Sequence, residues 1–351
     1  MTAGRTITRM RAEIGEQPRA LRDTIEVLLP RMSDVGLLAR GTRQVLFIAR
    51  GSSDNAAVYG RYLVESQAGR LATPAAPSIA TVYRSKVDLN GVLAVAISQS
   101  GRTEEIVQTL QWAADCGART IAITNGPASP LAQAAEVALI TEAGAETAVP
   151  ATKTYTAQLA ALAVLALGLG ADLDSADLRR VPDEVERLIE VTEDSAELAA
   201  IADELAQARG AVVSGRGLAF GTALELALKL KESCYLHAMG LSYADLLHGP
   251  IAVVDARTPA VLVAAEDGPA LPGTVALARR IAASGARAYG IGGGAALAGA
   301  CSRALPGPRL PEWVAPLGLI VPGQLVAEAL ARRLGRDPDL PRGLDKVTQT
   351  D

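Results

Sequence analysis

The chain has 351 residues, with 34 Lys or Arg against 38 Asp or Glu, so its formal charge is −4. This length predicts about two domains. A mildly acidic chain has no electrostatic footprint for a polyanion, so we expect no nucleic-acid partner. Hydrophobic residues make up 49% of the chain but aromatic residues only 3%, so Ala, Leu and Val must form the core.

Cysteine and histidine usage excludes two further classes. Three scattered cysteines without a CxxC pair predict neither a disulfide framework nor a zinc site, and two histidines disfavour a metal centre. The N-terminal arginines precede no apolar run, so we expect no secretory signal. The longest apolar run, Leu159 to Ala171, has 13 residues and is too short to span a bilayer. We therefore expect a cytoplasmic protein with no membrane partner.

The first half of the chain predicts an α/β domain. Residues 1–30 have helical spacing of apolar residues, and short apolar runs then alternate with helical stretches over 31–174. The runs that predict buried strands are Val45–Ala49, Val92–Ile97, Thr120–Thr124 and Val137–Ile140. Helices are predicted from about Ala56 to Gln67, up to about Cys116, and from Tyr155 onward. This alternation is typical of a parallel sheet with right-handed crossovers.

The second half repeats the pattern. Residues 175–207 predict a charged, amphipathic helical connection, and a second domain over 208–336 follows. Its predicted elements are strands Ala211–Ser214, Ala260–Ala265 and Arg287–Ile291 and a helix Thr222–His237. A weak similarity between residues 49–58 and 215–224 suggests a duplicated αβα domain. The tail, 337–351, contains Pro338 and Pro341 and cannot be a helix.

Two hydroxyl-rich turns stand where predicted strands end. One contains Ser98, Gln99, Ser100 and Thr103, and the other contains Ser52 and Ser53. Hydroxyls and free N–H groups at a helix N-terminus suit a phosphate group. The alternative is that these side chains only cap helices. No GxxxxGK[ST] motif occurs, so a nucleoside triphosphate is disfavoured.

The helix predicted from Thr222 carries Glu225, Lys229 and Glu232 at positions i, i+4 and i+7, on one stripe. An exposed stripe would be an ordinary surface pair, whereas a buried one would tune a carboxylate for general base work. The spacing of these three residues is compatible with both the exposed and the buried interpretation. His248, before Gly249-Pro250, is either a proton shuttle or a structural histidine.

Two further residues have ordinary interpretations at this point. His237, at the end of the predicted helix, is interpreted as structural. Lys346 lies in the irregular tail, where lysines are usually solvated.

Five segments together resemble the sugar isomerase (SIS) family. They are SQSGRTEE, AVPATKTYTAQLAAL, GRGLAFGTALELALKLKESCYLHA, DLLHGPIAVVD and PRGLDKVTQT. More narrowly, they are similar to the isomerase half of glutamine–fructose-6-phosphate aminotransferases and to stand-alone glucosamine-6-phosphate deaminases of the isomerase type. The resemblance implies an α/β fold of two αβα sandwich (SIS) domains, each with a five-stranded parallel sheet. It also implies a homodimer with a shared active site, and no metal or other cofactor.

The resemblance also implies roles for matching residues. Those at phosphate-binding positions are Ser53, Ser98, Gln99, Ser100 and Thr103, and those at sugar-contacting positions are Ser52, Val149 and Ala151. Glu232 matches the base that moves a proton between C1 and C2, with Lys229 and Glu225 as its charged neighbours. His248 matches a ring-opening histidine that reaches the neighbouring subunit's site. Lys346 matches a lysine that forms a Schiff base with the open-chain ketose.

Departures from the aminotransferase pattern narrow the expected reaction. The similar part starts almost at the N-terminus, so we expect no glutaminase activity, and Arg50, Arg102 and Ala151 replace its Cys, Glu and Ser. The expected reaction converts the phosphosugar glucosamine 6-phosphate to fructose 6-phosphate and ammonia. The alternatives are a phosphosugar isomerase, a fructosamine-6-phosphate deglycase, or a non-catalytic phosphosugar-binding regulator. The last is disfavoured because the chain retains Glu232, His248 and Lys346 together.

Overall fold

Two parallel sheets organise the chain in a computed structural model that describes residues 7–347 and 349. The β1–β5 unit comprises Arg19–Gly144, Thr154–Val181 and the chain from Val347. The β6–β10 unit comprises the chain through Pro18, Ala145–Lys153 and Pro182–Lys346. These units are interleaved in sequence. The domain ranges predicted from the sequence are contiguous, and those ranges remain a prediction. Residues 1–6 of the predicted N-terminal segment, and 348, 350 and 351 of the predicted tail, lie outside the described residues.

The β1–β5 unit has the strand order β2-β1-β3-β4-β5, with every pairing parallel. Its strands are β1 (Gln44–Ile48), β2 (Leu71–Pro74), β3 (Val92–Ile97), β4 (Arg119–Thr124) and β5 (Val137–Ile140). Its helices are chiefly α2 (Gln17–Leu28), α3 (Met32–Leu38), α4 (Ser52–Gln67), α5 (Ser78–Thr81), α6 (Glu104–Asp115), α7 (Pro130–Ala134) and α8 (Lys153–Gly168), with a 3-10 turn at Leu29–Arg31. Helices α6 and α7 pack on one face of this sheet. Helices α4 and α8 meet closely at Gly60, where an added Cβ would lie 2.7 Å from Leu162 Cδ2.

The β6–β10 unit has the order β10-β9-β8-β6-β7, again all parallel. Its strands are β6 (Gly210–Gly215), β7 (His237–Ser242), β8 (Ala260–Ala264), β9 (Ala288–Gly292) and β10 (Arg303–Leu305). Its helices are chiefly α1 (Arg9–Gly15), α9 (Ser175–Thr192), α10 (Ala196–Leu205), α11 (Phe220–Cys234), α12 (Tyr243–Leu247), α13 (Leu271–Ala283), α14 (Gly294–Ala298) and α15 (Pro316–Arg333), with 3-10 turns at Gly217–Ala219 and Pro250–Val253. Counted from its own first strand, each sheet has the order 2-1-3-4-5, which agrees with the proposed duplication. The predicted fold class is confirmed.

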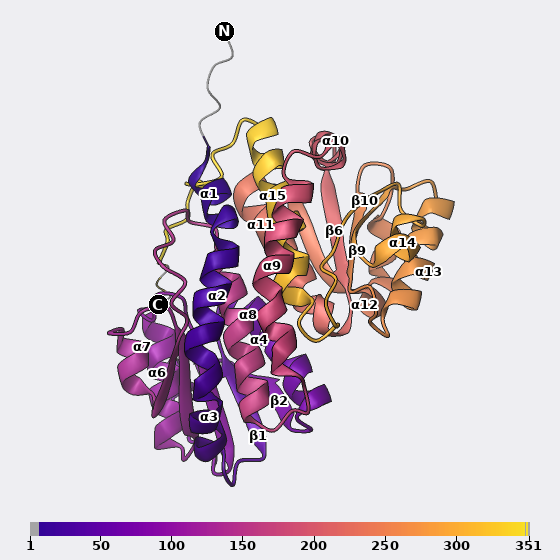
Figure 1. The fold of residues 1–351 in the computed structure, drawn as a ribbon. Helices are drawn as coiled ribbons and strands as arrows, with labels where there is room; N and C mark the ends of the chain where they lie inside the picture. The colour runs from indigo at the N-terminus through magenta and orange to yellow at the C-terminus, as the bar shows by residue number, and fades with distance from the viewer. Residues whose placement is uncertain (1–6, 348, 350–351) are drawn as a thin grey trace. The chain divides into compact units, whose positions relative to one another are not determined.

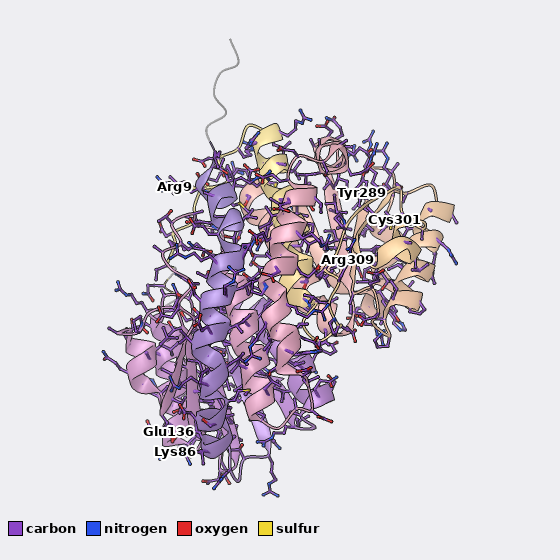
Figure 2. The ribbon with its side chains drawn as sticks, in the orientation of Figure 1. Arg9, Lys86, Glu136, Tyr289, Cys301 and Arg309 are labelled. Atoms are coloured by element: carbon purple, nitrogen blue, oxygen red, sulfur yellow. The ribbon has the colours of Figure 1, made fainter. Side chains whose placement is uncertain are left out.

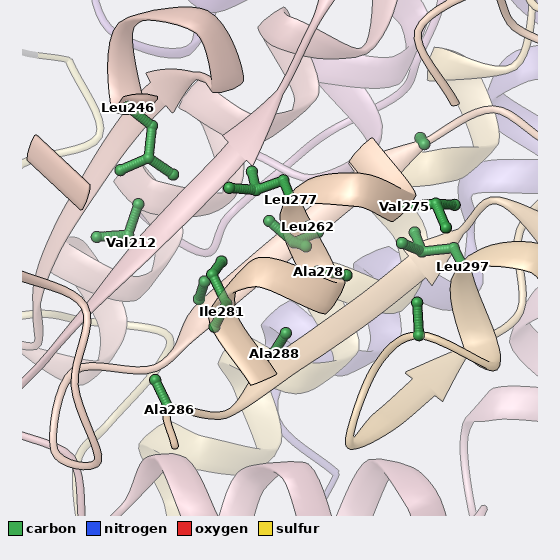
Figure 3. Packing of buried hydrophobic residues seen from close by; sticks show 13 residues of the cluster. Val212, Leu246, Leu262, Val275, Leu277, Ala278, Ile281, Ala286, Ala288 and Leu297 are labelled. Atoms are coloured by element: carbon green, nitrogen blue, oxygen red, sulfur yellow. The ribbon is translucent and has the colours of Figure 1, made fainter. Parts of the chain in front are cut away.

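The core of the β6–β10 unit explains why its helices lie where they do. Alternate residues of the central strands, such as Val212 and Leu262, face α13, whose Leu277 and Ile281 cover them (Figure 3). Helices α12 to α14 therefore cover one face, while α10, α11 and α15 pack together on the other (Figure 1). Burying a Leu or Ile side chain contributes about 1.5–3 kcal/mol.

The three strands that the sequence patterns did not predict, β2, β7 and β10, are all at sheet edges. Central strands are covered on both faces and form continuous apolar runs, such as the buried residues of β3. An edge strand has less to bury, and β2 buries only Ala72. The hydrophobic pattern therefore could not distinguish these short edge strands from loops.

Several predicted boundaries are corrected by backbone geometry. Helix α4 begins at Ser52, not Ala56. Helix α11 ends at Cys234 because Tyr235 takes the left-handed conformation (φ 55°), so His237 begins β7 as an exposed residue instead of ending a helix. The helical connection predicted over 175–207 is two helices, with Ser195 as the N-cap of the second. Within the described residues, no helix combines the length and apolarity needed to cross a membrane.

Candidate active site

The turn between β3 and α6 presents the first group of predicted site residues. Gly101 has φ 61°, and a Cβ there would lie 2.2 Å from Ser129 Oγ, so only glycine fits. Ser98 Oγ accepts a hydrogen bond from Gly101 N, and Ser100 Oγ accepts one from Arg102 N, both over 3.2 Å. These bonds fix the turn in a conformation that brings Ser98 to Thr103 together at the start of α6.

Capping alone does not account for Thr103. Thr103 is the N-cap residue of the 12-residue helix α6, yet its side chain makes no capping hydrogen bond. Ser98 and Ser100 bond within the turn and not to the first turn of the helix. Backbone N–H groups at such a helix end favour an anion. The turn is therefore equipped to bind a phosphate group.

Sequence reasoning missed one contributor to this turn, Gln349. Its Oε1 accepts a hydrogen bond from Glu104 N over 3.1 Å, and its Nε2 donates to the Arg102 carbonyl over 3.2 Å. A carboxamide oxygen thus satisfies an N–H at the start of α6. Gln349 lies within the segment PRGLDKVTQT, but that segment predicts nothing about its partner.

Ser52 and Ser53 lie in the first turn of α4, after Gly51, whose φ is 59°. Ser53 is buried. Beside them, Arg50 forms a two-pronged ion pair with Glu105 over 3.0 and 3.1 Å. This second helix start lies in the same β1–β5 unit as the 98–103 turn.

A buried row of charges lies along α11 in the β6–β10 unit. Lys229 Nζ is 3.2 Å from Glu225 Oε1 and 2.7 Å from Glu232 Oε2. The side chains of Glu225 and Lys229 are 0% exposed and that of Glu232 is 22% exposed. The exposed-pair interpretation of this stripe is therefore excluded.

The electrostatics of this row follow from its composition. Burial alone would lower the pKa of Lys229, but the negative charges of Glu225 and Glu232 outweigh burial and raise it. Lys229 therefore stays protonated. One carboxylate, Glu232, is backed by a permanent cation and reaches the surface, an arrangement that can exchange a proton with a bound molecule.

The C-terminal tail is anchored, so Lys346 is not a solvated lysine. Asp339 accepts hydrogen bonds from Arg9 N and Met10 N over 2.9 and 2.8 Å, and the Tyr235 hydroxyl accepts one from Arg342 N over 2.8 Å. Lys346 Nζ donates to Glu146 Oε2 over 2.7 Å and to the Ala148 carbonyl over 2.8 Å, and its side chain is 24% exposed.

The stretch 145–153 holds two of the three predicted sugar-contacting residues, Val149 and Ala151, which are half-buried. Val149 N donates to the Asp339 carbonyl over 2.9 Å. The structure therefore brings these two positions and the tail around Lys346 together.

Glu146 is a candidate residue that sequence reasoning missed. Its side chain is 0% exposed, and its second oxygen accepts a hydrogen bond from Thr152 N over 2.9 Å. Glu13 of α1 is bonded to the next residues, Thr147 and Ala148. Burial raises the pKa of Glu13, bonds from Thr147 oppose that rise, and the charge of Glu146 adds to it. The sequence signal for Glu146 is an acidic residue among small residues just before the segment AVPATK, and this signal does not predict its partner.

His248 is exposed directly after α12, where its backbone N–H donates to the Asp245 carbonyl over 3.1 Å. The structure does not bring its ring into the hydrogen-bond groups described around Lys229 and Lys346.

Comparisons with known proteins agree with this architecture. The model of the SIS domain matches residues 39–168. The glutamine–fructose-6-phosphate aminotransferase [isomerizing] of Methanothermobacter thermautotrophicus is 36% identical over 348 residues, covering 96% of this chain and 56% of the relative. The chain thus spans little more than half the length of the curated relatives it matches.

Two solved structures are similar along nearly the whole chain. One, from Silicibacter pomeroyi and provisionally described as a phosphosugar isomerase, has a TM-score of 0.86 and 32% identity, covering 95% of this chain and 100% of that one. The other is the C-terminal domain of glucosamine-fructose-6-phosphate aminotransferase from Francisella tularensis, with a TM-score of 0.85 and 27% identity, covering 97% and 100%. With two matching sheets and this coverage, the chain belongs to the SIS, or sugar isomerase, family.

Proposed function

We propose that this chain is a phosphosugar isomerase that removes the amino group of glucosamine 6-phosphate, giving fructose 6-phosphate and ammonia. The observation that carries the proposal is the row on α11, where buried Glu225 and Lys229 back a carboxylate, Glu232, that reaches the surface. Relatives named for fructose 6-phosphate chemistry support the substrate class.

Phosphate binding is assigned to the β1–β5 unit. Ser98, Ser100 and Thr103, with the N–H groups at the start of α6 that Gln349 leaves available, supply donors for phosphate oxygens, and Gln99, Ser52 and Ser53 are further proposed contacts. Hydrogen bonds to a charged group contribute about 1.5–3 kcal/mol each. This unit is therefore proposed to anchor the end of the sugar that does not react.

Proton transfer is assigned to α11. Once the ring is open, with His248 assisting, the C2 proton is acidic because it lies next to an aldehyde. Glu232 takes this proton and returns it at C1, which converts the 2-amino aldose to a 2-imino ketose, while Lys229 offsets negative charge on the intermediate. Water then adds to the imine carbon, and ammonia leaves. Val149 and Ala151 are proposed to contact the sugar.

The decisive experiment measures ammonia and fructose 6-phosphate together, using purified protein and glucosamine 6-phosphate. Equal amounts of both are expected. Glu232→Gln is expected to lower kcat by roughly 10²–10⁴-fold, the usual contribution of a general base, while sugar phosphate binding remains. Glu190→Gln, an exposed residue of α9, is the matched control and should be fully active.

Other results would replace this proposal with defined alternatives. Aldose–ketose interconversion of another phosphosugar without ammonia would indicate an isomerase. Release of an amino acid from a fructosamine 6-phosphate would indicate a deglycase. Binding without turnover across the whole panel would indicate a regulator, although binding alone gives no reason to bury the ion row of α11.

A homodimer is also part of the proposal. His248 is exposed, and so are three apolar side chains on neighbouring segments of the chain, Met239, Leu247 and Val253. Apolar residues exposed in this way are typical of surfaces that are covered in an assembly. Light scattering should give twice the chain mass, and a monomeric mass would remove the role proposed for His248 in a partner's site.

A further inference from the structure

We propose that Glu146 is a positioning residue that acts through Lys346: it accepts the ammonium proton of Lys346 and later returns it, so that the amine can form an imine with an open-chain ketose phosphate. This inference rests on the proposed function and on the imine-forming role that the resemblance implies for Lys346, and it adds the residue that activates this lysine. Nothing in the motifs quoted above includes Glu146.

Imine formation at Lys346 requires such a partner. An ammonium group has no lone pair and cannot add to a carbonyl carbon. Lys346 Nζ donates to one carboxylate, at 2.7 Å from Glu146 Oε2, and to the carbonyls of Ala148 and Val149 at 2.8 and 3.5 Å. A peptide carbonyl does not take up a proton at neutral pH. Among these acceptors, Glu146 alone can accept the proton directly.

The surroundings of Glu146 favour this transfer. Its side chain is fully buried, so its ionised form lacks solvation by water. The Glu13 carboxylate from α1 faces the same stretch, and the repulsion between the two charges is part of what raises the pKa of Glu13. Moving one proton from Lys346 to Glu146 replaces an ion pair with two neutral groups, so the transfer leaves no unpaired charge next to the buried carboxyl group.

The geometry also holds the acceptor still. Glu146 Oε1 accepts hydrogen bonds from the backbone N–H and the hydroxyl of Thr152 over 2.9 and 3.2 Å, which leaves Oε2 directed at Lys346. Lys153, next to Thr152, forms its own ion pair with Glu16, the residue that follows α1. The charged groups bonded to the 145–153 stretch are thus Glu13 of α1, Glu16 directly after α1, and Lys346 from the tail, and Lys153 lies within the stretch.

Imine formation at Lys346 conserves atoms and charge. Lys346 Nζ–H breaks, and its proton moves to Glu146 Oε2. The freed lone pair of Lys346 Nζ bonds to C2 of the open-chain ketose. A second proton then moves from Nζ to the carbonyl oxygen, which becomes a hydroxyl. This hydroxyl takes the proton from Glu146 and leaves as water. The products are a protonated lysine imine, one water molecule and the Glu146 carboxylate, with no oxidation or reduction.

The test uses two readouts on the full chain. Brief acetylation with acetic anhydride, followed by mass spectrometry of the tail peptide, measures the free-amine fraction of Lys346. Borohydride reduction in the presence of fructose 6-phosphate measures imine formation. In Glu146→Gln we expect faster acetylation of Lys346 at pH 7.5, because the variant lacks the adjacent negative charge that favours the ammonium form of a lysine. We expect trapping of the imine at least tenfold slower.

Opposite changes in the two readouts separate proton transfer from mere anchoring. A purely structural role would change both readouts in the same direction, and that result, or unchanged trapping, would overturn the inference. Glu146→Asp keeps the carboxylate, and we expect it to recover part of the trapping rate; no recovery in a folded protein would count against the inference. The matched control is Asp345→Asn, which removes an exposed carboxylate next to Lys346 in the chain and should leave acetylation within twofold of the parent.

Failure of this inference is distinct from failure of the proposed function. Ammonia release from glucosamine 6-phosphate is measured without reference to Lys346. If ammonia is released but the trapped adduct persists in Lys346→Arg, the adduct is not on Lys346. The deaminase then stands, and the inference on Glu146 falls. If no ammonia is released but the two readouts still change oppositely, the lysine chemistry stands and the chain uses fructose 6-phosphate in a different reaction.

Discussion

The two sheet units share one strand order but carry different chemistry. In the β1–β5 unit, the predicted site residues are neutral hydroxyls and backbone N–H groups at helix starts. In the β6–β10 unit, the candidate site also has buried or partly buried charged groups, which are Lys229 with its two glutamates and Lys346 with Glu146. Binding an anion needs donors but no buried charge, whereas moving a proton needs an ionisable group in a controlled environment. A duplicated scaffold can therefore separate holding a substrate from reacting with it.

The difference between the two units should have its largest effect on the free energy of unfolding when a buried charge of α11 loses its partner. Lys229→Met leaves Glu225 and Glu232 without the cation between them, which should lower the free energy of unfolding by about 3–5 kcal/mol. It should also lower kcat by roughly 10²–10³-fold, because the intermediate loses electrostatic stabilisation. Urea unfolding and ammonia release measure the two effects.

The control for this change removes a second charge. Glu225→Leu combined with Lys229→Met replaces a buried pair with apolar side chains and should recover much of the stability but none of the activity. If Lys229→Met alone is as stable as the parent, the ion row is not buried as described, and the contrast between the units fails.

A change in the β1–β5 unit should affect binding and leave stability nearly intact. Thr103→Val removes a hydroxyl that does not cap α6, so the helix loses nothing in the unliganded protein. Loss of one hydrogen bond to a charged phosphate should raise KM by roughly 10–100-fold with little change in kcat. Thr73→Val, at an exposed position of β2, is the matched control. An equal fall in kcat would show that this turn contributes to the reaction as well as to binding.

What could be predicted from the sequence follows the same contrast. Central strands such as β3 were predictable because both faces are buried, whereas β2, β7 and β10 gave no pattern. The hydroxyls of the 98–103 turn could be found because they lie together in the chain. The spacing of Glu225, Lys229 and Glu232 could be read, but whether they are buried depends on packing against other elements. Glu146 could not be found, because its partner Lys346 is 200 residues away.

The smallest expected effect comes from a charged cluster that is only partly buried, around Glu204 of α10. Its carboxylate accepts hydrogen bonds from Arg303 Nε and the Tyr289 hydroxyl, both over 2.7 Å, and forms an ion pair with Arg287 at 3.3 Å. Tyr289 is labelled in Figure 2. Partial burial alone would raise the pKa of Glu204, but these bonds and charges outweigh it and lower the pKa.

A carboxyl group whose pKa is lower in the folded than in the unfolded protein adds stability above its unfolded pKa and loses that contribution as the pH falls through its folded pKa. Glu204→Gln should therefore reduce the free energy of unfolding by about 1 kcal/mol near pH 7, with this difference shrinking as the pH falls below the ordinary range of a glutamate. Deaminase activity should not change. A loss as large as that of Lys229→Met, or one that persists at acidic pH, would mean that charge burial does not distinguish the functional row of α11 from an ordinary surface network.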